Sequence, residues 1–200
     1  MSVTSTYNRA LTVTGLAFGV STTISSDVGM PFSLSCAAAK IGSLTTRTDN
    51  DTGTLTMNSG HAITTGQRLD LFWSGGSRVG MTVGTVATNS VPIDGGSGDN
   101  LPIATTAITA QVPTEQAFAV TGNSVVVLAC GATVGGAVTF TDSSNVLIFS
   151  KTLTSTITNY VWASIDGGTN PLAGGTVAKV FLSNASSAGA GTVSGIAQYN

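Results

Sequence analysis

Loops that combine aspartate with glycine are the segments of this sequence that could do chemistry. The stretch VPIDGGSGDNLP, residues 91–102, carries Asp94 and Asp99 around a glycine–serine run. Carboxylates and backbone carbonyls are ligands of Ca²⁺, and glycine-rich loops can cradle a phosphate through backbone N–H groups. A phosphate loop normally leads into a helix N-terminus, whereas Pro102 predicts an extended exit here and the two aspartates would repel an anion. Short polar side chains beside glycine also close turns, so an ordered turn is the favoured interpretation and calcium is its alternative.

A second loop, TDNDTG at residues 48–53, matches the start of a calcium loop only loosely. The full pattern needs a glutamate about six residues beyond the glycine, and that position is Ser59. Turn closure explains both loops, so we expect no metal ion and no cofactor. The weak calcium candidates are Asp49, Asp51, Asp94 and Asp99.

Catalytic residue types are scarce. His61 is the only histidine and stands in NSGHAITTG, where a turn histidine is usually a surface or capping residue. Glu115 is the only glutamate, and almost all aspartates neighbour Gly, Asn, Ser or Thr, as in Asx-turns. A nucleophile needs a base beside it, and no GxSxG, HExxH, CxxC, Walker or dinucleotide pattern occurs. We expect no catalytic residue, no enzyme activity and no small-molecule substrate.

The two cysteines are too few for a disulfide framework or a zinc site. Cys36 and Cys130 both lie in apolar runs, SLSCAAA and VVVLACGA. A free cysteine in such a run behaves as a small buried hydrophobe. Buried thiols are favoured, and a bond between the two remains the alternative.

The composition excludes several classes of protein. Charged residues make up 8% of the chain, against roughly 25% in ordinary soluble domains, and the seven basic residues are scattered, so nucleic-acid binding is not expected. No run of eighteen apolar residues occurs, which argues against a membrane span. The N-terminus lacks the positive start and clean apolar centre of a secretory signal. We therefore expect synthesis in the cytoplasm without export.

Hydrophobic periodicity predicts an all-β fold with very little helix. Strict alternation of apolar and polar residues recurs in RALTVTGLAFGV, TGTLTM, RVGMTVGTVAT, GAVTFTD and GTVSGIAQY, and turn residues separate these runs at short intervals. This spacing is typical of an antiparallel β-sandwich or β-barrel. The two short helix candidates are PFSLSCAAAK (31–40) and TEQAFAV (114–120). Pro92 and Pro102 predict positions at a sheet edge, because proline cannot donate to a strand ladder.

The pattern divides the chain into three parts. We expect a small β-barrel over residues 44–112 and an antiparallel β-sandwich over 113–200, with a junction near Pro113. Residues 1–43 would add strands to the sandwich or extend as an N-terminal arm. As an arm, the segment would bind a partner through its alternating apolar residues; as the equally favoured alternative, it is an ordinary edge strand. The arm residues are Val3, Leu11, Val13, Leu16, Phe18 and Val20.

Aromatic residues are too few for an evident sugar-binding platform. Trp73 stands at the shoulder of a hairpin and Trp162 inside a strand, where each is expected to fill or cover a core. In QRLDLFW, residues 67–73, one face carries Leu69, Leu71 and Trp73 and the other carries Arg68, Asp70 and Phe72.

Two stretches carry a resemblance to structural proteins of tailed-bacteriophage virions. They are SVTSTYNRALTVTG near the N-terminus and GSLTTRTDNDTGTLTMNSGHAITTGQRLDLFW with its continuation to VPIDGGSGDNLP, which is similar to the small β-barrels appended to such proteins. The resemblance implies a non-enzymatic, multi-copy capsid-decoration, connector or tail component of the virion. Its partners would be other copies of itself, bound through sheet edges and the N-terminal arm, and other virion proteins. The alternative is a secreted or surface-layer β-sandwich module for adhesion or carbohydrate binding.

Overall fold

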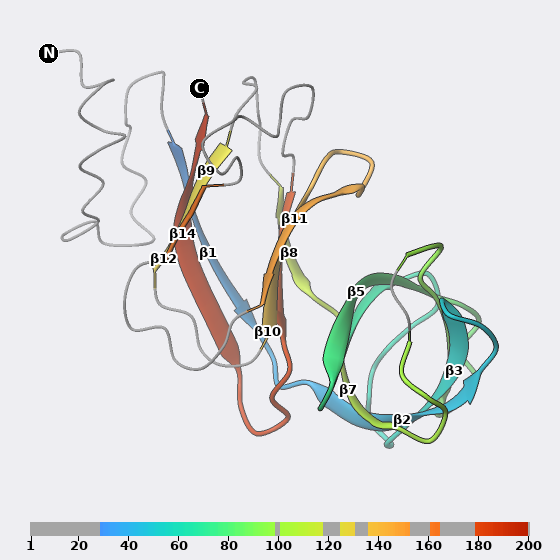
Figure 1. The fold of residues 1–200 in the computed structure, drawn as a ribbon. Coiled ribbons are helices and arrows are strands. Elements are labelled where there is room, and N and C mark those ends of the chain that lie inside the picture. Colours follow the sequence, from blue (N-terminus) through green and yellow to red (C-terminus); the bar gives the residue numbers. More distant parts are fainter. Residues whose placement is uncertain are drawn as a thin grey trace, which may run out of the picture.

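The described residues form antiparallel β-structure, organised as a sandwich of two sheets beside a closed barrel (Figure 1). The structure is a computed structural model that describes residues 29–98, 101–117, 125–130, 136–152, 161–164 and 179–199 of the 200-residue chain. No helix occurs in these ranges, so none of them forms a helix that could cross a membrane. The prediction of an all-β fold that combines a sandwich with a small barrel is confirmed.

The sandwich consists of two four-stranded sheets. Its core lies between the sheets, where Phe140, Leu182 and Val193 are almost completely buried. The first sheet has the order β1 (Gly29–Cys36), β14 (Gly191–Tyr199), β9 (Val125–Cys130) and β12 (Val161–Ser164). The second has the order β11 (Leu147–Thr152), β10 (Gly136–Thr141), β13 (Lys179–Asn184) and β8 (Thr114–Ala117).

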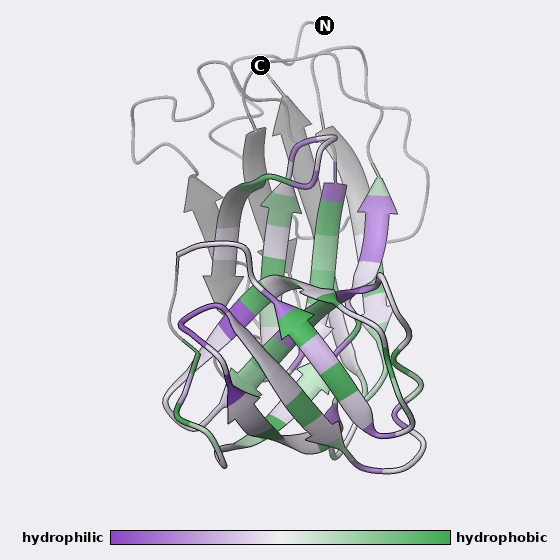
Figure 2. Ribbon diagram, turned by 90° about the vertical axis from the view of Figure 1, so that its right-hand side faces the viewer, coloured by the Kyte–Doolittle hydropathy of each residue, from purple (hydrophilic) through white to green (hydrophobic). Residues whose placement is uncertain are grey.

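The barrel closes six strands around a separate apolar core. Along β3, Leu55 and Met57 point inward and are fully buried, whereas the intervening Thr56 is exposed. Figure 2 shows the same banding of hydrophobic and polar positions along the barrel strands. This alternation is why the sequence forms strands here, since successive side chains of a strand point to opposite faces. The barrel order is β2 (Lys40–Arg47), β3 (Thr52–Met57), β6 (Ser90–Asp94), β5 (Gly76–Val83), β4 (Arg68–Trp73) and β7 (Ala107–Gln111).

The barrel is inserted between two strands of the sandwich. Strand β1 pairs with β14, the chain crosses at residues 37–39 into the barrel, and it returns through residues 112–113 to β8. The two crossings lie together, because the Thr114 hydroxyl donates to the Ser35 carbonyl at 2.8 Å. The barrel strands thus run from residue 40 to residue 111, whereas the sequence predicted a barrel over residues 44–112.

Part of the predicted N-terminal region is a sandwich strand. Residues 29–36 form β1, which pairs with β14 along its whole length. The remainder of that region, residues 1–28, lies outside the described residues, and so do all six residues of the predicted arm.

Both helix candidates were wrong within the described residues. The first contains most of β1, and the second begins with β8. In β1, Leu34 and Cys36 are buried while Ser33 and Ser35 are exposed, which is the two-residue period of a strand. Pairing with β14 and β13 supplies the backbone hydrogen bonds that a two-turn helix would have made internally.

The prediction of a sheet-edge position for Pro92 was also wrong, because β6 lies inside the closed barrel. Its carbonyl accepts a hydrogen bond from the Gly84 amide at 2.9 Å, on the side that faces β5. The ladder between β5 and β6 contains only two residue pairs, which end at Val83 and Ile93. Pro92 lies just beyond them, where its missing N–H leaves no gap in the ladder.

Candidate functional site

The two aspartate loops lie together at one end of the barrel and share one buried arginine. Arg78 on β5 is 5% exposed, and its Nη2 contacts the Gly95 carbonyl at 2.8 Å, the Ser97 carbonyl at 3.1 Å and Asp51 Oδ1 at 3.2 Å. Backbone hydrogen bonds join the same loops, from Gly95 N to the Asp51 carbonyl and from Leu101 N to the Asn50 carbonyl. A side chain at position 95 would collide with the guanidinium. The GGSG segment therefore wraps a cation of the chain itself.

Two of the four calcium candidates, Asp49 and Asp94, close turns, and a third, Asp51, pairs with Arg78. Asp49 Oδ1 accepts hydrogen bonds from the amides of Asp51 and Thr52, at 2.8 and 2.7 Å, and these bonds lower the pKa of Asp49. Asp94 Oδ1 accepts from the Gly96 amide at 2.7 Å, the geometry of an Asx-turn. Among the described residues no three His, Cys, Asp or Glu side chains gather into a metal site. Asp99 lies outside those residues.

Calcium is expected to leave the stability of the folded chain unchanged. One oxygen each of Asp49, Asp51 and Asp94 is committed to an amide or to Arg78, so converging free oxygens are few. We expect the melting temperature to change by less than about 1 °C between excess chelator and millimolar calcium, because a ligand stabilises only by binding the native state. Differential scanning fluorimetry checks this. A rise that disappears in Asp94→Asn would show a calcium site.

His61 joins two loops of the barrel. Its Nδ1 accepts a hydrogen bond from the Ile63 amide at 3.0 Å, so the ring hydrogen is on Nε2, which donates to the Thr88 carbonyl at 2.9 Å. Both ring nitrogens are thus bound to backbone groups, and the side chain is 9% exposed. The ring has the contacts of a structural residue that holds together segments far apart in sequence.

Strand β4 is buried on both faces because its outer face packs against the sandwich. Leu69 and Leu71 belong to the barrel core, whereas Asp70 and Phe72, which point outward from the barrel, are 0% and 6% exposed. Arg68, in the same outer row, lies over the Phe181 ring of β13 with 4.4 Å between the guanidinium carbon and the ring centre. The sequence places these three residues on one face, but their burial depends on the docking of another part of the chain.

Asp70 is the centre of a buried polar cluster at this interface. Its Oδ1 accepts from the Gly80 amide at 2.7 Å and lies 3.7 Å from Arg68 Nε. Burial raises the pKa of Asp70, and the charge of Arg68, the Gly80 amide and the Ser183 hydroxyl act in the opposite direction. Asp70 Oδ2, Arg68 Nε and Gln111 Oε1 are buried without a hydrogen-bond partner in the described part of the chain. Asp70 and Gln111 are directly opposite each other on β4 and β7.

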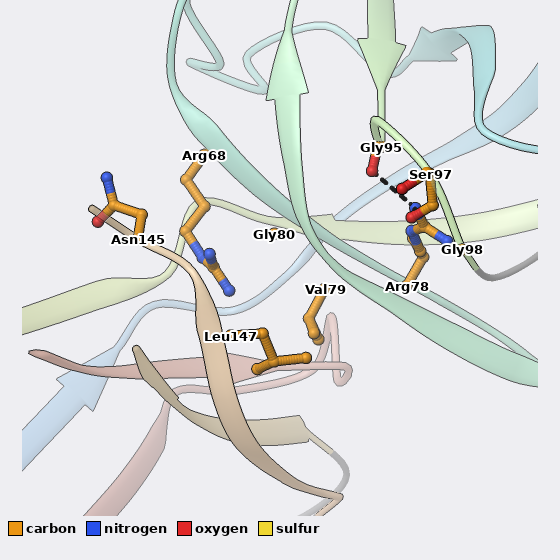
Figure 3. A pocket seen from close by; sticks show the side chains of 9 residues that line it. All are labelled: Arg68, Arg78, Val79, Gly80, Gly95, Ser97, Gly98, Asn145 and Leu147. Carbon is orange, nitrogen blue, oxygen red and sulfur yellow. Dashed lines mark hydrogen bonds between the residues drawn. The ribbon is translucent and has the colours of Figure 1, made fainter. Parts of the chain in front are cut away.

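Two depressions flank the junction of barrel and sandwich. One, with a cavity volume of about 230 Å³, contains both Arg68 and Arg78 in its wall (Figure 3). The other, of about 400 Å³, lies beside Trp73, whose ring also packs on the barrel core and against the Gly75–Gly76 turn. The second depression is lined by Ile41, Phe72, Trp73, Ser74, Ala107, Ile108, Thr109, Ala185 and Ser187.

Cys36 is a free, buried thiol in β1. Burial raises the pKa of this thiol, which lowers its reactivity at neutral pH. Cys130 lies on β9, with β14 between the two strands. The thiol state favoured from the sequence is therefore the state of Cys36.

No protein family, curated protein or solved structure matches the chain.

Proposed function

We propose that this chain is a non-enzymatic structural protein of a tailed-phage particle, a capsid-decoration, connector or tail component that assembles through sheet edges and an N-terminal arm. The observation that carries the proposal is the pairing of a closed barrel, which has no edge, with an open sandwich, whose two sheets end, among the described residues, in the edge strands β1, β12, β11 and β8. An edge strand presents unpaired backbone groups, to which a neighbouring copy can add a strand.

The edges of the sandwich differ in how they are protected. β1 and β8 lie on the side of the two crossings into the barrel, where Thr114 bonds to Ser35. At the opposite side, β11 pairs only with β10 among the described residues. The start of this strand is apolar and open, because Val146 and Leu147 are 59% and 54% exposed. An apolar residue exposed at the start of an edge strand supports strand addition at β11, whose single charged residue is Lys151.

The surface chemistry is consistent with repeated assembly. Hydroxyl and glycine residues replace charges over most of the chain, whose net charge is −2. Such a surface gives little electrostatic repulsion between copies. Weak contacts that are repeated in a symmetric particle reinforce one another.

The full chain is expected to form a defined oligomer that depends on its N-terminal arm and on the β11 edge. Light scattering over a range of concentrations should give a mass several times that of one chain. Removal of residues 1–20, or Leu147→Lys in the full chain, should lower this mass toward the monomer, because either change removes an apolar contact or adds charge at an edge.

Ile103→Lys is the matched control. Ile103 lies in a barrel loop and is 74% exposed, so the substitution adds the same charge at an equally open apolar residue away from the sheet edge. Its oligomer should remain intact. A strict monomer at every concentration, unchanged by the truncation, would contradict assembly through these elements.

A carbohydrate-binding or adhesion module is the second candidate function. It is favoured by the depression at Trp73, whose lining combines aromatic rings with the hydroxyls of Ser74, Thr109 and Ser187 and contains no charged side chain. Aromatic faces with neutral hydroxyls suit a sugar ring. A monomer that binds neutral saccharides would favour this function over assembly.

A further inference from the structure

The cavity that contains the two arginines lies between the barrel and the turn that joins β10 to β11 (Figure 3). Its barrel wall comes from β4, β5 and the loop after β6, and its sandwich wall comes from the turn before β11 and the start of that strand. The lining residues are Arg68, Arg78, Val79, Gly80, Gly95, Ser97, Gly98, Asn145 and Leu147.

The lining has an excess of positive charge. Among the described residues, two of the seven basic residues of the chain line the cavity and no aspartate or glutamate does. Asp70 and Glu115 act electrostatically on Arg68, but neither lines the cavity. In a wall partly shielded from water, a fixed cation attracts an anion more strongly than it does on an open surface.

Arg68 has hydrogen-bond donors to offer. It makes no hydrogen bond to any described residue, since its contact with Asp70 Oδ1 is an ion pair at 3.7 Å, beyond hydrogen-bond distance. Stacking on Phe181 holds the plane of the guanidinium. Gly80, with φ of +80°, leaves the space that the guanidinium occupies, because a Cβ there would lie 2.9 Å from Nη1.

Arg78 contributes mainly its positive charge to the cavity, because its Nη2 already donates hydrogen bonds within the protein. Its Nη2 is directed at Asp51 and at the carbonyls of Gly95 and Ser97. Burial raises the pKa of Asp70, the carboxyl behind Arg68. The cavity thus combines one oriented guanidinium with a second cation nearby.

We propose that this cavity binds a small oxyanion, a carboxylate or a phosphate group, through the guanidinium of Arg68. The planar fork of arginine matches two oxygens of either group. A volume of about 230 Å³ accommodates such a group or a small molecule that carries it. Because the walls belong to the barrel and to the sandwich, the bound anion also holds the two domains together.

The test uses the full chain with inorganic phosphate and, separately, acetate as probes at constant ionic strength, so that general screening is unchanged. Calorimetry and the NMR shift of the Arg68 Nε–H are the readouts. Saturable binding in the roughly millimolar range is expected for one probe or both, and the comparison of probes identifies the preferred oxyanion.

Two variants assign the site. Arg68→Gln should abolish the binding. Asn145→Asp puts a carboxylate in the cavity wall, beside Lys179 Nζ, which lies 2.9 Å from Asn145 Oδ1 and partly neutralises the new charge, so binding should weaken about threefold. The control is Asn58→Asp. It adds the same charge directly after Met57, the last residue of β3, and Asn58 does not line the cavity, so the affinity should be unchanged. Absence of saturable binding of both probes, or binding that survives Arg68→Gln and Asn145→Asp, would overturn the proposal.

Discussion

Arg78→Ala is expected to lower the free energy of unfolding by about 3 kcal/mol, the lower end of the cost of removing one partner of a buried ion pair. The substitution leaves Asp51 without its counter-ion and the carbonyls of Gly95 and Ser97 without their donor. The estimate is at the lower end because the Asp51 side chain is 21% exposed and water can reach it. Urea denaturation at neutral pH measures the change.

Arg47→Ala is the matched control. Arg47 Nε donates to the Asp49 carbonyl at 3.0 Å in the same end of the barrel, but this bond lies at the surface. Loss of an exposed contact of this kind costs at most about 1 kcal/mol. If the two variants were equally stable, Arg78 would not be the residue that holds the two loops.

The strands of the barrel were predictable from the sequence because each has one face on a single apolar core. In TGTLTM the apolar positions Leu55 and Met57 are the buried ones, and the polar positions between them face outward. A period of two residues is a local property, so a sequence shows it directly. In the sandwich the same signal predicted β10 and β14, whereas β1 and β8 were expected as short helices.

Burial that depends on domain docking was not predictable in this way. The outer row of β4 was assigned correctly to one face, yet a pattern cannot show that Phe181 and its neighbours on β13 cover that face. The same holds for β10, in which Thr139 and Thr141 are as deeply buried as Phe140. These residues owe their environment to contacts between segments far apart in sequence.

The role of the aspartate loops was half predictable. Turn closure by Asp49 and Asp94 follows from their neighbours in the chain and is what the hydrogen bonds show. The link between the loops depends on Arg78, which is 27 residues from Asp51 in sequence. Its only sequence signal is a single arginine in an otherwise uncharged strand, GSRVGMTV.

Asp70→Ala is expected to destabilise the protein by about 3 kcal/mol, whereas Asp70→Asn should be within about 1 kcal/mol of the original at neutral pH. Both substitutions remove the negative charge beside Arg68, but only alanine also removes the acceptor of the Gly80 amide. Asparagine keeps an oxygen for that amide and can direct its NH₂ to the unpartnered Gln111 Oε1 on the opposing strand. It also removes the cost of burying a charge.

The pH dependence of the stabilities of the original chain and of Asp70→Asn shows whether burial or the attraction of Arg68 has the larger effect on the pKa of Asp70. Since burial raises the folded-state pKa above the unfolded value of about 3.9, the contribution of Asp70 to stability is fully present below that value and is lost as the pH rises through the folded-state pKa. The free energy of unfolding of the original chain, minus that of Asp70→Asn, should therefore fall as the pH increases from about 4. Urea denaturation of both proteins from acid to neutral pH measures this difference, in which the other carboxyls cancel. If the attraction of Arg68 outweighed burial, the difference would rise with pH instead, and the buried carboxyl would be a fully ionised partner of that arginine.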